Sequence, residues 1–135
     1  MKIRIISSRE EINSLRPNEK AVHMSFRASN VDYLNLLQKV PRLQMIQVPP
    51  SYTKTLSKAI GVFLEMQGVK LIEGDVWGHR KDLDDYFTVD DTTMEEIRSL
   101  TASGVSMDDV ADQVQRKAKL SPDLVKYLAS TKITA

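Results

Sequence analysis

The segment LQMIQVPP, residues 43–50, shows how this chain is organised. Its first six residues are mostly apolar, which is typical of a short buried strand, and the two prolines that follow end the strand. An amphipathic helical pattern starts at Ser51, and Gly68 is placed to end it in a left-handed conformation. The residues of this helix that we expect to face inward are Leu56, Ile60, Phe63 and Leu64.

Further strands are predicted on both sides of this segment. They are KIRIIS at residues 2–7, AVHMSF at 21–26 and VKLIEG at 69–74. Short apolar strands that alternate with helices favour right-handed crossovers between parallel strands. The sequence therefore predicts an α/β fold with a small, mainly parallel sheet of about four strands. The strand residues that we expect to be buried are Leu43, Ile46, Val48, Leu71 and Ile72.

Two more helices are predicted between these strands. Ser8 and Glu11 have the spacing of a capping box, which would open a short helix over residues 8–15. Asn30 is predicted to cap a second helix, which Pro41 ends. The residues that we expect to face inward from this second helix are Val31, Leu34, Leu37 and Val40.

The apolar spacing also has the rhythm of a leucine-rich repeat. It recurs in two sets of residues, first Leu37, Val40, Leu43, Ile46 and Val48, then Phe63, Met66, Val69 and Ile72. The asparagine of that repeat is missing, because Gln47-Val48-Pro49 offers no equivalent. A tight helix-to-strand turn can give the same rhythm, so we favour an ordinary small sheet and keep a leucine-rich solenoid as the alternative.

The composition of the sequence changes after Trp77, from alternating apolar segments to polar residues. Residues 81–92 are polar and acidic, and we interpret them as a connector with one helical turn at most. Three short helices are predicted after it, with Gly104 after the first, Ser106 capping the second, and Ser121-Pro122 opening the third. We therefore divide the chain into an α/β sheet domain at 1–80, the connector at 81–92 and a helical segment at 93–135.

Composition excludes several classes of protein. The net charge is +1, so no global field attracts the chain to nucleic acid or to an acidic membrane. There is no cysteine, which excludes disulfides, thiolate metal sites and cysteine catalysis. The N-terminal residues have no signal-peptide pattern, and no apolar run is long enough to span a membrane. We expect a cytoplasmic protein with no membrane contact.

No catalytic, cofactor or metal motif can be assembled. The sequence has no GxGxxG, no GxxxxGK(S/T) and no GxSxG, and its aspartates at 82–91 lack the spacing of a calcium loop. There are only two histidines, and His23 alternates with the inward residues of its strand, so we expect a structural role for it. We predict no catalytic residue, no metal and no cofactor; an Asp75/His79 acid–base pair is the one enzymatic possibility left open.

A ligand site is predicted where the parallel strands end. The carboxyl ends of such strands share one edge of the sheet, which is where ligands of open α/β sheets bind. Helix N-termini at Asn30 and Ser51 would favour an anion there. The side chains gathered at this edge would be Arg27, Ser29, Asn30, Ser51, Tyr52, Asp75, Trp77, His79 and Arg80. The alternative for GDVWGHR, residues 74–80, is a strand end in which the glycines turn the chain and Trp77 completes the core.

The order and lengths of the C-terminal helices are similar to those of a helix-turn-helix. In this interpretation SPDLVKYL, residues 121–128, is the helix that would enter the major groove. Residues 116–135 hold five basic residues against one acid. The predicted nucleic-acid contacts are Arg116, Lys117, Lys119, Ser121 and Lys126. Two features oppose this interpretation: the QRKAKL connection is longer than the usual turn, and the helix before it is acidic. Three helices that pack on the sheet or on a partner are the alternative.

The chain resembles a conserved protein family of methanogenic archaea whose function is uncharacterised. The resemblance covers most of the chain and is carried by VPP, GDVWGHR and GVSMDDVA together with the alternation of strands and helices. It implies a cytoplasmic archaeal protein with a regulatory or accessory role, but no activity, cofactor or catalytic residue.

The sequence thus favours a non-enzymatic accessory or regulatory protein that binds DNA or another protein through its C-terminal helices. The alternative is a domain that binds a small anionic ligand, or acts on one, at the GDVWGHR edge. A homodimer is also expected, because so small a sheet has exposed edges.

Overall fold

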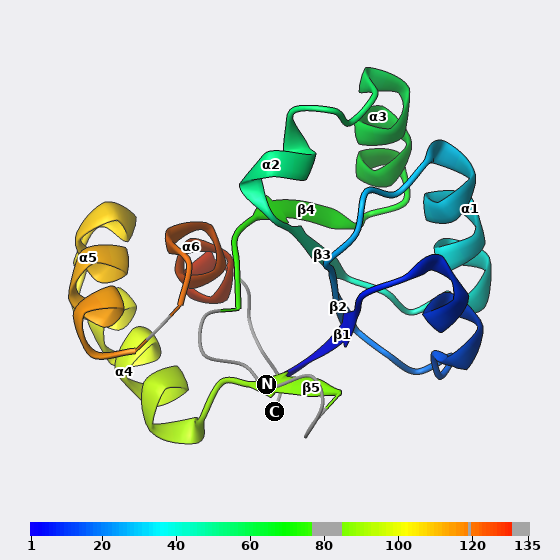
Figure 1. Ribbon diagram of the computed structural model, residues 1–135. Coiled ribbons are helices and arrows are strands. Elements are labelled where there is room, and N and C mark those ends of the chain that lie inside the picture. The colour runs from blue at the N-terminus through cyan, green and yellow to red at the C-terminus, as the bar shows by residue number, and fades with distance from the viewer. Residues whose placement is uncertain (77–84, 119, 131–135) are drawn as a thin grey trace.

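The computed structural model describes residues 1–76, 85–118 and 120–130 (Figure 1). Its elements in chain order are β1 (Lys2–Ile6), η1 (Arg9–Ser14), β2 (Ala21–Met24), α1 (Asn30–Lys39), β3 (Met45–Val48), α2 (Pro50–Thr53), α3 (Lys58–Met66), β4 (Lys70–Glu73), β5 (Tyr86–Thr88), α4 (Asp91–Ala102), α5 (Met107–Lys117) and α6 (Pro122–Ser130). The protein is therefore an α/β protein with three helices after its sheet, as the sequence predicts.

The sheet has five strands in the order β4-β3-β2-β1-β5. The first four strands are parallel and adjacent in chain order, with Val22 opposite both Arg4 of β1 and Ile46 of β3. β5 is antiparallel to β1 and lies inside the predicted connector, so the sheet is mainly parallel as predicted but has one strand more than the sequence indicates. The strand was missed because it has three residues between acidic ones, and its pairing with β1 stabilises it.

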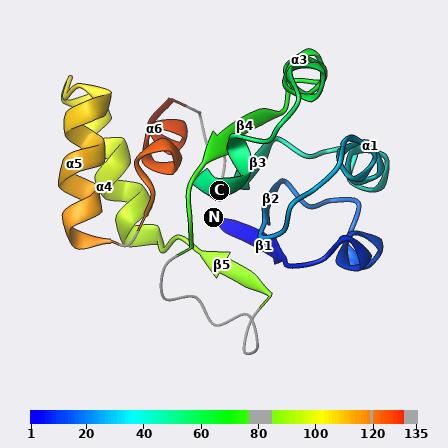
Figure 2. The same ribbon diagram turned by 45° about the horizontal axis from the view of Figure 1, so that its top comes forward.

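Each face of the sheet is covered by a different group of helices (Figures 1 and 2). On one face η1, α1 and α3 pack against residues such as Val22, Met24 and Ile46. On the other face α4, α5 and α6 pack against Ile3, Ala21, Met45 and Ile72. The successive strand–helix units of β1–β4 stack as in a solenoid, but the C-terminal helices cover the strand face that repeat proteins use as an open concave surface.

Strand alternation explains why both cores form. Consecutive side chains of a strand point to opposite faces, so Ala21 joins one core and Val22 joins the other. The predicted burial of Leu43, Ile46, Val48 and Ile72 is confirmed, whereas Leu71 is half-buried.

Several helix predictions need correction. The helix at residues 8–15 is a 3₁₀ helix, although Glu11 does accept hydrogen bonds from the backbone N–H groups of Ser7 and Ser8. The cap of α1 is Ser29, whose hydroxyl accepts from the Asp32 N–H at 3.3 Å, and not Asn30. The inward residues of α1 are also shifted, since Val31 and Leu34 are 61% and 41% exposed while Tyr33 and Leu36 are buried.

The long helix predicted from Ser51 is broken in two. The hydroxyls of Thr53 and Thr55 donate to the carbonyls of Pro50 and Tyr52, and such local bonds compete with helix continuation. Ser57 then caps α3, and its hydroxyl accepts from the Ile60 N–H. Of the four residues predicted to face inward, Ile60 and Leu64 are buried, whereas Leu56 and Phe63 are half-buried.

Both predicted helix-ending glycines are confirmed. Gly68 and Gly104 have φ values of 74° and 83°, a left-handed conformation that glycine adopts without a steric cost. Ser106 also caps α5 as predicted, since its hydroxyl accepts from the Asp109 N–H.

Two glycine-to-alanine substitutions should shift stability in opposite directions. A Cβ at Gly74 would lie 2.3 Å from Ser121 Oγ and 2.6 Å from Gln47 Nε2, so Gly74→Ala should lower the free energy of unfolding by about 2 kcal/mol. Gly61 in α3 has open space around it, so Gly61→Ala should raise that free energy by about 0.5–1 kcal/mol. Urea unfolding curves of both variants measure this, and an unchanged midpoint for Gly74→Ala would contradict the close contact.

Candidate macromolecule-binding site

The third helix of the predicted helix-turn-helix, α6, lies between the sheet and the other two C-terminal helices (Figures 1 and 2). Its apolar residues Leu124, Val125 and Leu128 are at most 4% exposed. They belong to one core with residues of the sheet, such as Ile72, and of α5. The helix that would enter a DNA groove is therefore packed against the sheet and does not protrude.

The first turn of α6 is hydrogen-bonded to the end of β4. The Ser121 hydroxyl accepts from the Asp75 N–H at 2.9 Å and donates to the Asp75 carbonyl at 3.2 Å. The Asp123 carboxylate accepts from the Glu73 N–H at 3.3 Å. Ser121 is 2% exposed and its side chain attaches α6 to the sheet, so its contact with nucleic acid stays a prediction without support from this structure.

Two of the predicted DNA-contacting cations have partners within the helical segment. Lys117 of α5 lies 2.9 Å from Glu96 of α4, and Lys126 of α6 lies 2.8 Å from Asp108 of α5. The hydrogen bond and the charge of Asp108 raise the pKa of Lys126, and the same bond lowers the pKa of Asp108. These cations connect helices to one another, so they form no common basic face.

The other two predicted cations add little to a basic surface. Arg116 is exposed at the end of α5, and Lys119 lies outside the described residues. Residues 85–130 as a whole contain nine acids and five bases, a balance of −4. The electrostatic footprint of the C-terminal helices is therefore opposite in sign to that of a DNA-binding domain.

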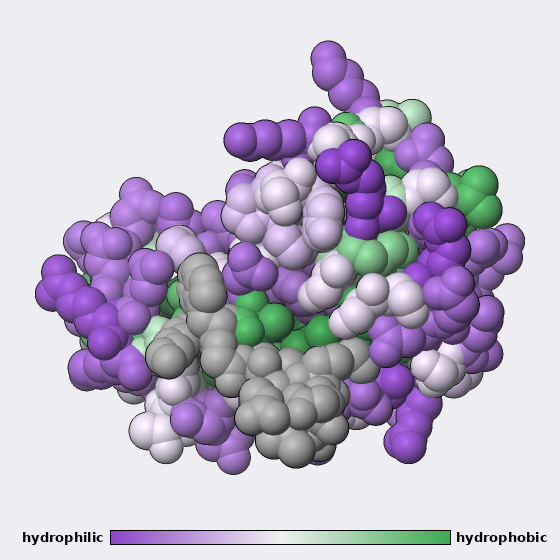
Figure 3. Space-filling model, viewed as in Figure 1, coloured by the Kyte–Doolittle hydropathy of each residue, from purple (hydrophilic) through white to green (hydrophobic). Residues whose placement is uncertain are grey.

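The outer faces of α4 and α5 are hydrophilic (Figure 3). Asp108, Asp109 and Asp112 are exposed in the first half of α5, next to Met107, which is 44% exposed.

An open groove lies between α4 and α6. It has a volume of about 240 Å³ and, among the described residues, is lined mainly by apolar side chains: Met94, Ile97, Thr101, Ala102, Leu128 and Ala129, with Arg98 at its side. A phosphate backbone gains nothing from such a lining, whereas an apolar side chain of a protein would be buried there.

The predicted ligand edge is only partly described. Trp77, His79 and Arg80 lie outside the described residues, and within the described residues no hydrogen bond or ion pair joins Arg27, Ser51 and Tyr52 to one another. The side chains of Ser29 and Asn30 are used within the fold: Ser29 caps α1, and Asn30 accepts a hydrogen bond from the Ser57 hydroxyl at 3.0 Å. The Asp75 main chain is hydrogen-bonded to Ser121.

The topology also removes the reason for expecting a ligand at this edge. A binding crevice forms where neighbouring strands send their connections to opposite faces. Here the connections after β1, β2 and β3 all lead to helices on one face. The composite ligand site therefore stays a prediction without support from the described residues.

A shallow hollow that the sequence analysis missed lies between η1 and α1. It has a volume of about 290 Å³ and is lined by Arg9, Glu10, Ile12, Asn13, Asp32 and Asn35. Its main charges neutralise each other, since Arg9 lies 3.4 Å from Asp32. We could not have found it from the sequence, because no motif joins these two helices.

The histidine for which the sequence predicts a structural role lies inside the sheet. His23 is fully buried, and its Nδ1 lies 2.8 Å from Oε1 of Gln47, which is on the neighbouring strand and also fully buried. The pair faces the C-terminal helices, because Ala21 and Met45, two residues earlier in each strand, belong to that core.

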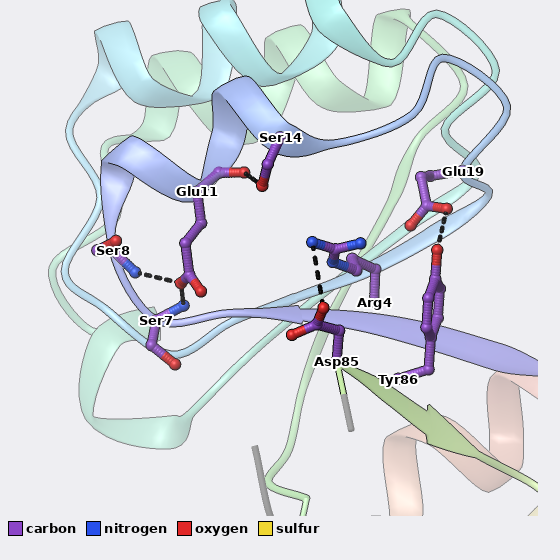
Figure 4. A network of polar contacts seen from close by, with 8 residues as sticks. All are labelled: Arg4, Ser7, Ser8, Glu11, Ser14, Glu19, Asp85 and Tyr86. Carbon is purple, nitrogen blue, oxygen red and sulfur yellow. Dashed lines mark hydrogen bonds and ion pairs between the residues drawn. The ribbon is translucent and has the colours of Figure 1, made fainter. Parts of the chain in front are cut away.

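A polar network attaches β5 to the sheet (Figure 4). The Tyr86 hydroxyl donates to Glu19 at 2.6 Å, and Arg4 lies 3.8 Å from Asp85 with its guanidinium 5.4 Å from the centre of the Tyr86 ring. Burial, and then the hydrogen bond with Glu19, raise the pKa of Tyr86 above its ordinary value. The phenol therefore remains a neutral donor to one oxygen, Oε1, of Glu19, a residue that is 8% exposed.

Fold and site together define an α/β protein with a C-terminal helix-turn-helix-like unit docked on its sheet. The sequence matches a family model over residues 2–85, described as "Family of unknown function (DUF1699) N-terminal domain". It matches a second over residues 92–130, described as "Protein of unknown function (DUF1699) C-terminal HTH domain". The chain therefore belongs to the DUF1699 family, and its last three helices correspond to a helix-turn-helix domain. No curated protein and no solved structure matches it.

The part of the chain that the structure describes contains neither a metal-binding cluster nor a membrane-spanning helix. No three histidine or acidic residues are placed to hold a metal ion. No helix within residues 1–76, 85–118 and 120–130 is long and apolar enough to cross a membrane.

Removing one hydroxyl tests the network around β5. Tyr86→Phe keeps the ring over Arg4 but leaves the Glu19 carboxylate without its donor, which should lower the free energy of unfolding by about 1–3 kcal/mol. Tyr52→Phe is the control, because no hydrogen bond from the Tyr52 hydroxyl is recorded among the described residues, and its stability should not change. Equal chemical-denaturation midpoints for the two variants would show that the network contributes nothing.

Proposed function

We propose that this protein is a non-enzymatic accessory or regulatory protein that binds another protein through its C-terminal helix-turn-helix domain. The binding surface consists of the outer face of α5 and the groove between α4 and α6. The partner would present basic side chains to Asp109 and Asp112, and an apolar side chain to the groove.

The observation that carries this proposal is the docking of α6. A DNA reader needs an exposed recognition helix with basic side chains on one face. In this protein the apolar side of α6 is buried, its first turn is bonded to β4, and Lys126 is paired with Asp108. The free surface of the domain is acidic, which suits a protein partner and repels phosphate.

DNA is the second candidate, because the family model describes the domain as helix-turn-helix. Insertion of α6 into a major groove would require the helix to leave β4. That would break the hydrogen bonds of Ser121 and Asp123 and expose Leu124 to water.

A photo-crosslinking residue in place of Gln113, which is exposed on α5, tests the proposed function in cells. We expect a discrete protein adduct that decreases at least fivefold in Asp109→Asn/Asp112→Asn, because the partner loses two attractive charges. Glu10→Gln/Glu65→Gln makes the same charge change on exposed residues outside the C-terminal helices and should leave the adduct unchanged.

Two results would reject protein binding at this surface. One is a nuclease-sensitive adduct, which would favour the DNA candidate. The other is equal adduct yield in the Asp109→Asn/Asp112→Asn variant and in the control, which would show that the acidic face of α5 is not used.

A further inference from the structure

The two halves of the chain have opposite charge, and the positive half is not the helix-turn-helix. Residues 1–76 contain eleven bases and seven acids, a balance of +4, against −4 for residues 85–130. Five of those bases lie where the chain enters β2, β3 and β4: Arg16, Lys20, Lys39, Arg42 and Lys70. We call these five residues the basic edge.

Parallel strands bring these residues to one side of the sheet. The entries to β2, β3 and β4 all lie at the amino-terminal edge of the sheet, opposite the edge where the sequence predicts a ligand. Two backbone hydrogen bonds fix the register there: Gln44 N–H donates to the Lys20 carbonyl at 2.8 Å, and Lys70 N–H donates to the Gln44 carbonyl at 2.9 Å. Neighbouring strands are about 4.8 Å apart, so the backbones of Lys20 and Lys70 are about 10 Å apart.

The cations of the basic edge are available to a ligand. All five residues are exposed, and the structure gives none of them an ion pair among the residues that it describes. On the C-terminal helices, by contrast, Arg98, Lys117 and Lys126 each have a carboxylate partner. The C-terminal end of α1 favours a cation and accounts for Lys39, but the other four lie outside helices.

The chemistry around the cations matches phosphate and sugar contacts. The three connections at residues 15–20, 40–44 and 67–69 contain a single acid, Glu19, which is buried and bonded to Tyr86. Exposed carboxamides lie in or next to them, namely Asn18, Gln38, Gln44 and Gln67. Of their apolar residues, Leu15, Val40, Leu43 and Val69 are buried, whereas Pro17 and Pro41 are exposed, as is Met66 just before residue 67. The apolar surface here is therefore three separate side chains and not a continuous centre for a protein interface.

From this placement we propose that the basic edge binds the sugar–phosphate backbone of a nucleic acid, independently of the C-terminal helices. Arginine, lysine, asparagine and glutamine are the side chains that position a protein on phosphates. A strand carries one phosphate per about 3.4 Å of helix axis, so the stretch of roughly 10 Å from Lys20 to Lys70 spans about three phosphates. Together with the proposed function, the protein would join a nucleic acid at one end to a protein at the other.

A salt titration with random-sequence 20-base-pair duplex DNA and with single-stranded RNA of the same length tests this. If all five cations contact phosphates of a duplex, the log–log slope of affinity against salt is about −4.5, which means a loss of about 500-fold between 50 and 200 mM salt. Lys20→Gln/Lys70→Gln should reduce the slope to about −2.7 and the loss to about 40-fold. For the single strand each contact contributes about 0.7, so the wild-type slope is about −3.5.

Two matched variants locate the binding. Lys54→Gln/Lys58→Gln removes two exposed cations from the α2–α3 region and should leave the slope unchanged. Arg116→Gln/Lys117→Gln removes two exposed cations from α5 and should likewise leave the salt slope unchanged. If this α5 variant reduces the slope and the edge variant does not, nucleic acid binds at the helix-turn-helix and the basic edge is excluded.

Further outcomes would overturn the proposal. One is that neither nucleic acid binds at 50 mM salt. The other is that polyglutamate of equal charge competes as strongly as an unlabelled nucleic acid does, which would indicate that the basic edge binds an acidic protein. Arg16→Gln/Arg42→Gln repeats the test should Lys20→Gln/Lys70→Gln fail to fold, and each variant is checked by urea unfolding. The crosslinking from Gln113 reports on a different surface, so failure of one proposal leaves the other standing.

Discussion

The contact between Gly74 and Ser121 joins the two parts of this protein. A side chain at residue 74 would overlap the Ser121 hydroxyl and the Gln47 amide, so only glycine lets the end of β4 approach α6 so closely. That approach brings Ser121 within hydrogen-bond distance of the Asp75 main chain. It also positions α6 over Met45 and Ile72, which would otherwise be exposed on the open face of the sheet. The same contact that completes the core thus occupies the helix that a DNA-binding protein would leave free.

The parts of the fold that follow from local pattern could be predicted from the sequence. The apolar pattern of the short strands identified β1–β4, Gly104 identified the end of α4, and Ser106 identified the start of α5. The start of α4 was missed, because Asp90, which caps it, lies in the segment predicted to be a connector. What failed depends on partners far away in the sequence. β5 is held by bonds between Ile5 and Asp85 and between Met1 and Val89, which no local signal around Tyr86 reveals. The buried face of α1 is set by its neighbours, so Tyr33 and Leu36 replaced Val31 and Leu34.

The candidate sites also differ in whether local sequence or long-range contacts determine them. A count of charges near the C-terminus suggested a basic helical surface, but it could not show that Lys117 would reach Glu96 or that Lys126 would reach Asp108. For the basic edge, the sequence hid a cluster of cations that the fold brings together. Its cations are spread from Arg16 to Lys70, where no run of charge marks them, and only the parallel order of the strands brings them to one edge. Pairing between elements decides which cations are available, and pairing is a property of the tertiary structure.

The covering of one sheet face by the last three helices sets the order in which this protein can mature during synthesis. The ribosome releases β1–β4 with η1, α1 and α3 first, and these can assemble one complete core on their own face. The other face, with Ile3, Ala21 and Met45, remains exposed to water until residues 122–130 have left the ribosome. During that interval the half-finished sheet exposes an apolar surface to the crowded space around the ribosome. The nascent chain is therefore most vulnerable to aggregation late in translation, when most of its residues have already been joined.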